Sequence, residues 1–450
     1  MSINFEVENL GKITSGNFRL SNMTVVTGPN GTGKSFFTKF LYSIFATVEN
    51  FTVWGHTRNT LNNILDTLND VINDYDDVEE YAILLKERVE YLIENQFSPH
   101  SSPGSYIEEQ KLLKSLHPES LFLNEYFIKE FSNYIKLPEK ELREEHINIY
   151  YLQSSFEVLP IFTSDDTTTY QYFIARSLGS ELKKNFQIES LNELIQHGKD
   201  EVTFNFNSSI DITIKRDVNT VKVALKKNAI DFFRNKPKSV FFESPAYWRV
   251  RDALIEARLN TQGDYLSGVP KYFFDLDKAL RLKSISNEGL EDIFENIKNE
   301  LGGEFEITGN DIVFNENTGV SISKNLVSFG MTNIGMLNAL IKNNVIRCGS
   351  YVFIDEPETN LHPDWQLLMI DSLIKLSKRG VKVIINTHSI EILKHIENSF
   401  KELSQDILAV NYVDVDGETY EFESEIPWEQ TAEARENLSG TYFNLYMNGI

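Results

Sequence analysis

The sequence predicts an α/β fold in which helices flank a mixed sheet, together with an antiparallel β-lobe and a helical, coiled-coil-like insertion. A glycine-rich loop stands between a short apolar segment and an apolar helix, within residues 23–45. A second apolar segment ends on two carboxylates at residues 355–356, and strands alternate with helices through the last third of the chain. Such alternation is typical of a largely parallel sheet covered by helices.

The glycine-rich loop fits the phosphate-binding pattern G-x-x-x-x-G-K-[ST]. Its residues are Gly28, Pro29, Asn30, Gly31, Thr32, Gly33, Lys34 and Ser35. Residues 23–27 predict a buried strand before the loop, and residues 36–45 predict a helix after it. In this setting backbone N–H groups and the helix N-terminus bind phosphate. We expect Lys34 to reach the β- and γ-phosphates of ATP and the Ser35 hydroxyl to ligate Mg²⁺.

The second motif is the apolar run 351–354 followed by Asp355, Glu356 and Pro357. The run predicts a buried strand, and the proline ends it. We expect Asp355 to hold Mg²⁺ and Glu356 to polarise the water that attacks the γ-phosphate. Together with the phosphate loop, this strand predicts an ATPase. The alternative interpretation is a plain acidic turn at the end of a strand.

Three further elements fit around the phosphate loop. Ser328 and Gly330 open a predicted helix, where a hydroxyl and backbone N–H groups can meet an anion, although an ordinary helix cap is the alternative. His388 follows the apolar strand 381–386 and can reach the γ-phosphate or the attacking water, although it can also be a turn residue. The third element is the loop 358–362, which leaves the Asp-Glu strand.

The expected segments are four: 1–50, the N-terminal part of the nucleotide-binding head; 51–150, the helical insertion; 151–235, a helical segment with the β-lobe; and 236–450, the C-terminal part of the head. The insertion has apolar residues at alternating spacings of four and three, which predicts a heptad seam. Its members are Ile64, Leu68, Val71, Tyr75, Val78, Ala82, Leu85, Val89 and Leu92. An antiparallel helical hairpin that projects from the head explains this pattern, and a compact helical lobe is the alternative.

Periodicity predicts the remaining elements. They are a hairpin of strands 3–7 and 18–20, an antiparallel meander over 201–225, a core strand at 239–242, helices at 247–259 and 333–343, a helix after residue 363, a strand pair at 407–413 and 418–422, and a terminal helix.

Composition limits the class of protein. The chain has 450 residues, 41% apolar and 24% charged, as an ordinary soluble globular protein does. The single cysteine, Cys348, excludes an internal disulfide, and the sequence has neither a spanning apolar run nor a signal peptide, so we expect a cytoplasmic protein. The net charge of −23 disfavours nucleic-acid binding and suits a basic protein partner. A local basic strip remains, interpreted as a solvated face: Lys222, Lys226, Lys227, Arg234, Lys236 and Lys238.

The ordered motifs resemble the ABC-type ATPase heads. Within them the chain is most similar to the clade of OLD-like, RecF-like and Rad50/SMC-related proteins, because the phrase 354–363 is highly specific to that clade. The resemblance covers residues 1–50 and about 200–400. It implies a head-to-tail dimer with two ATP molecules at the interface, in which Ser328 and Gly330 contact the γ-phosphate of the partner's ATP. It also implies Glu356 as the general base, His388 as the switch histidine, and residues 359–361 facing the second subunit.

The sequence departs from the family pattern in two places. Residues 327–331 are Val-Ser-Phe-Gly-Met in place of Leu-Ser-Gly-Gly-Gln, which puts contacts by Phe329 and Met331 in doubt. The glutamine that completes Mg²⁺ coordination in the family has no clear counterpart, and Gln153 and Gln171 are the candidates.

Two functions compete. Only 62 residues follow His388, so we expect no Toprim nuclease domain of the kind that OLD-type nucleases carry. The first function is an ATP-driven switch subunit of a bacterial multi-protein system in antiphage defence, similar to the PARIS and Septu types, which controls a separate nuclease-like effector. The second is a DNA-repair or DNA-clamp ATPase of the RecF/Rad50 type that binds duplex DNA directly. The acidic net charge favours the first.

Overall fold

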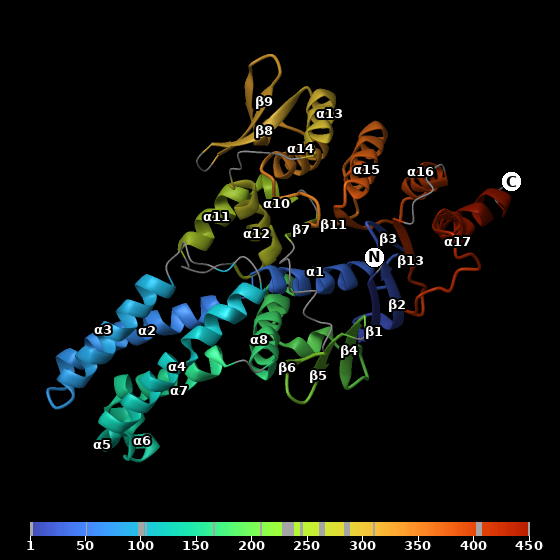
Figure 1. Cartoon of the computed structure of the whole chain (residues 1–450). Helices are drawn as coiled ribbons and strands as arrows, with labels where there is room; N and C mark the ends of the chain where they lie inside the picture. Colours follow the sequence, from blue (N-terminus) through green and yellow to red (C-terminus); the bar gives the residue numbers. More distant parts are fainter. Residues whose placement is uncertain are drawn as a thin grey trace. The chain divides into compact units, whose positions relative to one another are not determined.

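The computed structural model describes residues 3–50, 52–97, 103, 106–164, 167–207, 209–226, 238–243, 246–260, 266–282, 289–308, 311–401 and 407–448. The chain divides into two compact units (Figure 1). The head unit comprises Met1–Glu49, Arg176–Ala224 and Pro237–Ile450, and the helical unit comprises Asn50–Ala175 and Leu225–Lys236. The predicted fold class is confirmed, with parallel and antiparallel sheets in the head unit and a helical insertion.

A five-stranded parallel sheet forms the centre of the head unit, in the order β13-β3-β12-β11-β7. The strands are β3 (Met23–Thr27), β7 (Ser239–Phe242), β11 (Tyr351–Asp355), β12 (Lys382–Asn386) and β13 (Leu408–Tyr412). Their Val, Ile and Phe runs are buried, as helices on the sheet require. These helices include α1 (Lys34–Asn50), α12 (Lys271–Leu280), α15 (Pro363–Lys378) and α17 (Pro427–Asn448). Helix α1 packs on β11, where Phe45 stacks on Tyr351 at 4.0 Å.

The register of this sheet places the predicted site residues at one edge. Asp355 at the end of β11 lies opposite Asn386 at the end of β12, and Asn386 lies opposite Val26 of β3. The phosphate loop begins directly after β3. The carboxyl ends of parallel strands are the usual ligand-binding edge of an α/β sheet.

A second sheet has the order β2-β1-β4-β5-β6 and contains the predicted hairpin and meander. Its strands are β1 (Ile3–Leu10), β2 (Ile13–Leu20), β4 (Glu201–Phe206), β5 (Ile210–Lys215) and β6 (Thr220–Leu225). A third sheet, β10-β9-β8, was not predicted. It consists of β8 (Gly303–Thr308), β9 (Asp311–Glu316) and β10 (Ser321–Ser323), beside helices α13 (Glu291–Leu301) and α14 (Phe329–Lys342).

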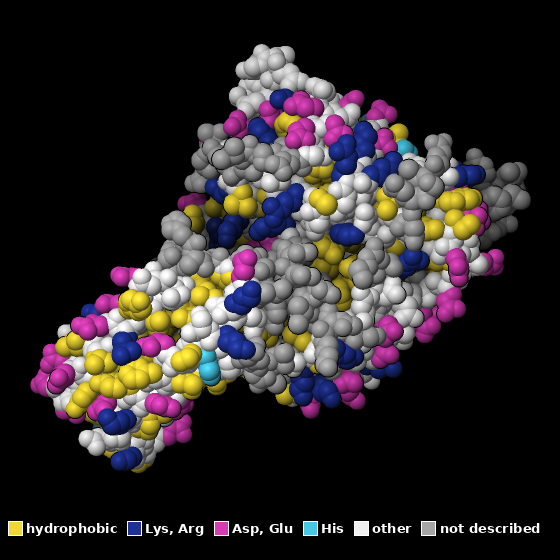
Figure 2. Space-filling model, in the orientation of Figure 1, with side chains coloured by type: hydrophobic (Ala, Val, Ile, Leu, Met, Phe, Trp, Pro, Cys, Tyr) yellow, Lys and Arg dark blue, Asp and Glu magenta, His cyan; other side chains and the backbone are white. Residues whose placement is uncertain are grey.

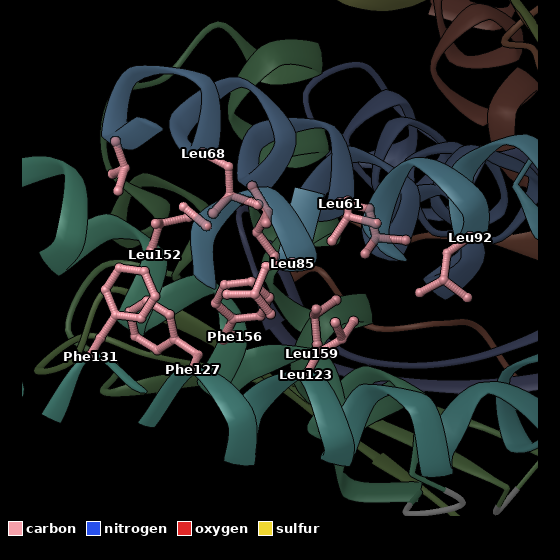
Figure 3. Close-up of a cluster of buried hydrophobic side chains, with 14 of the residues drawn as sticks. Leu61, Leu68, Leu85, Leu92, Leu123, Phe127, Phe131, Leu152, Phe156 and Leu159 are labelled. Atoms are coloured by element: carbon pink, nitrogen blue, oxygen red, sulfur yellow. The ribbon is translucent and has the colours of Figure 1, made fainter. Parts of the chain in front are cut away.

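The helical unit is built on one shared core. Its helices are α2 (Val53–Asp74), α3 (Glu79–Gln96), α4 (Tyr106–Glu130), α5 (Ser132–Ile135), α6 (Glu139–Glu145), α7 (Ile147–Thr163) and the first part of α8 (Thr167–Phe186). Leucine and phenylalanine side chains from α2, α3, α4 and α7 point toward one another in Figure 3. The predicted two-helix hairpin is therefore wrong, and the alternative of a compact helical lobe describes this unit.

The predicted heptad seam is interrupted. Helix α2 ends at Asp74 and α3 begins at Glu79, so Tyr75 and Val78 lie in the turn between them. The segment 73–77 contains an asparagine and three aspartates, which favour turns over helix interiors. The seam residues on both helices still face the shared core, because α2 and α3 pack together after the turn. The spacing of the apolar residues correctly predicted which side chains face the core, but it did not predict that the chain reverses direction between α2 and α3.

Several other expectations need correction. The expected boundary at residue 150 falls inside α7, and the helical unit continues to Ala175. The helix expected at 247–259 is divided into α10 (Ala246–Arg249) and α11 (Arg251–Asn260). In place of the strand expected at 418–422, only Glu418 and Thr419 form isolated bridges, with Ser15 and Val413 respectively. The remaining elements are α16 (Ile390–Lys401) and the short 3₁₀ helices η2 (Leu191–Leu194) and η4 (Lys324–Leu326). Over the described ranges, no helix is long and apolar enough to cross a membrane.

Candidate active site

The phosphate loop joins β3 to α1 and requires glycine at its first position. Gly28 has a φ of 137°, and a Cβ there would lie 2.1 Å from the carbonyl oxygen of Val413. Any other residue at this position would strain the loop and collide with the backbone after β13. The glycine that begins the phosphate-loop pattern is therefore required for steric reasons.

Lys34 closes the loop on itself. Its Nζ donates hydrogen bonds to the carbonyl oxygens of Gly28 (2.8 Å) and Pro29 (2.6 Å), and the side chain is only 9% exposed. Burial lowers the pKa of Lys34, and the nearby carboxylates of Asp355, Glu356 and Glu358 oppose that shift. A buried ammonium group held inside a glycine-rich loop is suited to bind the phosphate chain of a nucleotide.

The two predicted motifs meet at Ser35 and Asp355. The Ser35 hydroxyl donates a hydrogen bond to Oδ1 of Asp355 across 2.9 Å. Burial raises the pKa of Asp355, while hydrogen bonds from Asn386 and Ser35 act in the opposite direction. A hydroxyl and a carboxylate side by side are hard oxygen ligands of the kind that Mg²⁺ prefers.

Asn386 supports Asp355 from the neighbouring strand. Its side-chain nitrogen donates to Oδ1 of Asp355 (2.8 Å) and to Oγ1 of Thr38 in α1 (2.7 Å). Its side-chain oxygen is buried and has no hydrogen-bond partner among the described residues. Asn386 thereby ties the ends of β11 and β12 to the helix that follows the phosphate loop.

Glu356 leaves the strand in an unusual backbone conformation. Its φ is 51°, its N–H donates to the carbonyl oxygen of Asn386 (2.9 Å), and its side chain is 49% exposed. The Thr359 hydroxyl donates to Oε2 of Glu356 at 3.2 Å. A positive φ at a residue with a side chain is strained and marks functional sites. The strain here coincides with the residue predicted to act as general base.

His388 lies between two carboxylates. Its Nδ1 is 3.6 Å from Oε1 of Glu356 and 3.6 Å from Oε1 of Glu358. Oε1 of Glu358 also accepts hydrogen bonds from the Thr387 hydroxyl (2.9 Å) and from the backbone N–H of His388 (3.2 Å). Burial raises the pKa of Glu358. Glu358 therefore fastens the end of β12 to the loop that follows β11.

These residues surround a cavity of about 350 Å³ in the head unit. The lining comprises Lys12, Asn30, Gly31, Gly33, Lys34, Ser35, Phe36, Asp355, Glu356, Asn386, Thr387 and His388. The cavity combines the Lys34 ammonium group, which can bind phosphate, with the backbone of the glycine-rich loop. It also has hard oxygen atoms, of which the Asn386 side-chain oxygen has no hydrogen-bond partner among the described residues. This donor set fits a nucleotide with its Mg²⁺: Lys34 and the loop would hold the phosphates, and Ser35 and Asp355 would hold the metal.

Ser328 and Gly330 do not line this cavity. Ser328 is the N-cap of α14 and accepts a hydrogen bond from the N–H of Met331 at 3.2 Å, as in the helix-cap alternative. Gly330 packs against the loop after β11, where a Cβ would lie 2.8 Å from the carbonyl oxygen of Asn360. Arg249 stacks over the ring of Phe329 at 4.4 Å.

The two glutamine candidates for Mg²⁺ do not line the cavity either. Both belong to the helical unit, and the Gln153 side chain donates to Glu157 of its own helix at 2.9 Å.

Sequence reasoning missed Asn386 and Lys12 as residues of this site, and it singled out the loop 358–362 without giving Glu358 a role. Lys12 lies in the turn between β1 and β2, far from any motif. Asn386 and Glu358 stand directly beside the predicted residues, but neither belongs to a spacing pattern. The order of the parallel strands could have pointed to Asn386. A polar residue that ends the strand next to that of Asp355 lies at the same edge of the sheet.

The fold and this cavity define a P-loop nucleotide hydrolase. The family model described as an AAA ATPase domain matches residues 1–393, and the chain belongs to that family. It is an ATPase. The Old nuclease of Escherichia phage P2 is 42% identical over 57 residues, which are 12% of this chain and 10% of the nuclease.

Two solved structures align with the chain at low identity and low TM-score. The SMC head domain from Thermotoga maritima aligns over 94% of this chain and 98% of its own length, with 10% identity and a TM-score of 0.36. The Smc head domain with a coiled coil and joint from Pyrococcus yayanosii aligns over 97% of this chain and 100% of its own length, with 12% identity and a TM-score of 0.34.

Proposed function

We propose that this ATPase is a cytoplasmic switch subunit that uses Mg²⁺ and ATP to assemble, and that it controls a separate protein effector. The effector we propose is a nuclease, and the setting is antiphage defence in bacteria. The observation that carries the proposal is the distribution of charge, because acidic side chains are enriched in the helical unit. The helical unit, residues 50–175 and 225–236, contains 23 acidic and 13 basic side chains. Its net charge of −10 is more than two fifths of the net charge of −23, although the unit has fewer than a third of the residues.

Hydrolysis is assigned to the cavity residues. Lys34 binds the β- and γ-phosphates, Ser35 and Asp355 hold Mg²⁺, Glu356 takes a proton from the attacking water, and His388 orients Glu356 at the γ-phosphate. The 3.6 Å separation of His388 and Glu356, and the half-exposed position of Glu356, support these roles. Mg²⁺ when bound supplies charge neutralisation to the phosphates.

Assembly is assigned to a homodimer that encloses two ATP molecules. Ser328 and Gly330 open α14, and Gly330 contacts Asn360 of the loop after β11. The two elements proposed to face the partner therefore lie together on one chain, while neither Ser328 nor Gly330 lines the cavity of its own chain. This arrangement supports a site that is completed by a second copy.

The helical unit offers a surface suited to a basic protein. Helix α7 buries Leu152, Phe156 and Leu159 in the core, but its opposite face exposes Ile147 (40%), Tyr151 (56%) and Ile161 (51%). Acidic and apolar side chains lie beside one another on the surface of this unit in Figure 2. Duplex DNA would be repelled by such a surface, whereas a basic protein with apolar side chains would be attracted.

One lysine of the basic strip is paired with a carboxylate, which weighs against the DNA-binding alternative. In the basic strip, Lys227, Arg234 and Lys236 lie outside the described residues. Lys238 forms an ion pair with Glu49 at 2.8 Å, so its charge is partly neutralised.

The test compares two nucleotide-site variants in the native host. The Glu356→Gln protein should hold ATP and retain the effector through affinity capture and mass spectrometry, whereas Lys34→Ala should lose the effector. Tyr151→Arg should weaken capture, and Tyr91→Arg, at an equally exposed tyrosine of α3, serves as the matched control. Fluorescent duplex DNA is titrated in parallel at physiological salt. Nanomolar binding to DNA would replace this proposal with the DNA-clamp function.

A further inference from the structure

Asn386 occupies a central place in the cavity that the family motifs do not explain. It is the last residue of β12 and pairs with Asp355 in the parallel sheet. The residue is 2% exposed, and its backbone oxygen accepts the N–H of Glu356 at 2.9 Å. It therefore contacts both acidic residues of the predicted hydrolytic pair.

The orientation of its amide follows from the chemistry of the neighbours. Asp355 as a carboxylate can only accept, so the NH₂ group of Asn386 must face it. The Thr38 hydroxyl has backbone acceptors in Lys34 (3.4 Å) and Ser35 (3.3 Å), which leaves it to accept the second N–H of Asn386. Both donors of the amide are thus used inside the protein.

The amide oxygen has no such partner. It is buried and makes no hydrogen bond to any residue that the structure describes. An unpaired buried acceptor destabilises a protein, and an apolar residue at this position would avoid the cost. The oxygen is free to accept a donor or a cation from outside the protein. Asn386 lines the cavity with Ser35 and Asp355, so a nucleotide and metal in that cavity are candidates for this partner.

We propose that Asn386 is a positioning residue of the Mg²⁺ site. Its NH₂ group fixes the Asp355 carboxylate, and its oxygen accepts a hydrogen bond from water bound to Mg²⁺. This contact lies outside the first coordination shell of the metal, so it differs from the direct ligand for which Gln153 and Gln171 were the sequence candidates. The inference rests on the proposed nucleotide site and deepens it, because it assigns a metal-directed role to a residue outside the recognised motifs.

The test measures metal binding directly. Mn²⁺ is titrated into the full chain with a non-hydrolysable ATP analogue, and free Mn²⁺ is followed by electron paramagnetic resonance. Asn386→Leu should weaken Mn²⁺ binding about tenfold or more, and affinity for the analogue in EDTA should stay within about twofold. Asn386→Thr keeps a hydroxyl group that can donate to Asp355 but lacks the longer amide group that carries the acceptor oxygen. This variant should therefore also weaken Mn²⁺ binding.

Asn338→Leu is the matched control. Asn338 in α14 is 1% exposed, both of its side-chain polar atoms lack partners within the described residues, and it does not line the cavity. This variant should bind Mn²⁺ as the wild type does. Wild-type Mn²⁺ affinity in a folded Asn386 variant would overturn the inference and leave the nucleotide site intact. Failure of the wild-type protein to bind the analogue would instead overturn the proposed function.

Discussion

Ser35 donates a hydrogen bond to Asp355 across 2.9 Å, although the two residues are 320 positions apart in the chain. This contact joins the phosphate loop to the Asp-Glu strand. Asn386 holds the same carboxylate oxygen at 2.8 Å from the other side. The face of the site that we propose to hold Mg²⁺ is therefore organised by contacts within the protein, as efficient electrostatic stabilisation of a phosphoryl transfer requires.

Removing the Lys34 side chain should abolish nucleotide binding. The buried ammonium supplies the positive charge for the β- and γ-phosphates, so Lys34→Ala should weaken ATP binding about 100-fold or more. Thermal shift with Mg²⁺ and ATP measures the effect, because a ligand that binds only the folded state raises Tm. Lys215→Ala, at an exposed lysine of β5, is the control. An undiminished ATP-induced shift in Lys34→Ala would refute the phosphate-loop assignment.

Glu358 should matter for turnover more than for binding. Its Oε1 accepts from the Thr387 hydroxyl and the His388 backbone, which holds His388 beside Glu356. Glu358→Ala should lower kcat about tenfold and change KM less than about twofold, because orientation is lost and phosphate contacts remain. Glu358→Gln keeps an acceptor oxygen and should lie close to wild type. Equal rates for Glu358→Ala and wild type would exclude a positioning role.

The ion pairs of Glu304 should make stability depend on pH. Burial favours the protonated form, but hydrogen bonds from Lys342 (2.5 Å) and Lys298 (2.9 Å) outweigh it and lower the pKa of Glu304. A carboxyl group whose pKa is lower in the folded than in the unfolded protein stabilises the fold at pH values above its pKa in the unfolded state. This stabilisation is lost as the pH falls through the pKa of the folded state.

Glu304→Gln should therefore lower the stability of the head unit by about 1 kcal/mol at pH 7. The difference from wild type should shrink as the pH falls below about 4.5, the region where the unfolded carboxyl titrates. Thermal unfolding at a series of pH values measures this. A difference that stays constant with pH would show that the ion pairs are not its source.

The core of the helical unit should be sensitive to truncation. Phe156 is fully buried, and its ring lies 5.0 Å from that of Phe127. Phe156→Ala should destabilise this unit by about 3–5 kcal/mol, through lost apolar burial and the cavity left behind. Urea unfolding followed by circular dichroism detects the change. Tyr151→Ala, on the exposed face of the same helix, should change stability by less than about 1 kcal/mol.

Local patterns predicted the parts of the fold that depend on short segments. The phosphate loop, the strand ending in Asp355 and the 201–225 meander each carry their signal within a few residues. The heptad seam failed as a helix prediction because residues on either side of the turn at 75–78 face one core, and spacing alone does not reveal a reversal.

The missed parts depend on contacts between distant segments. In the third sheet, β8 and β9 each alternate only two apolar residues, against three in each strand of the meander, and β10 has three residues, so the periodic signal is weaker. Asn386 follows an ordinary apolar strand, and only its pairing with Asp355 in the parallel sheet reveals its place in the site. Gly330 was predicted to meet nucleotide, but its contact with Asn360 comes from packing that no local pattern records.

The Glu356→Gln variant tests the central claim most directly. Glutamine keeps the size of the side chain and can still accept the Thr359 hydrogen bond, but it cannot take a proton from water. Phosphate release and retention of radiolabelled ATP after rapid gel filtration are measured on the same sample. We expect hydrolysis to fall about 100-fold or more, with ATP trapped on a dimeric protein. Hydrolysis at the wild-type rate, with ADP released, would contradict the account.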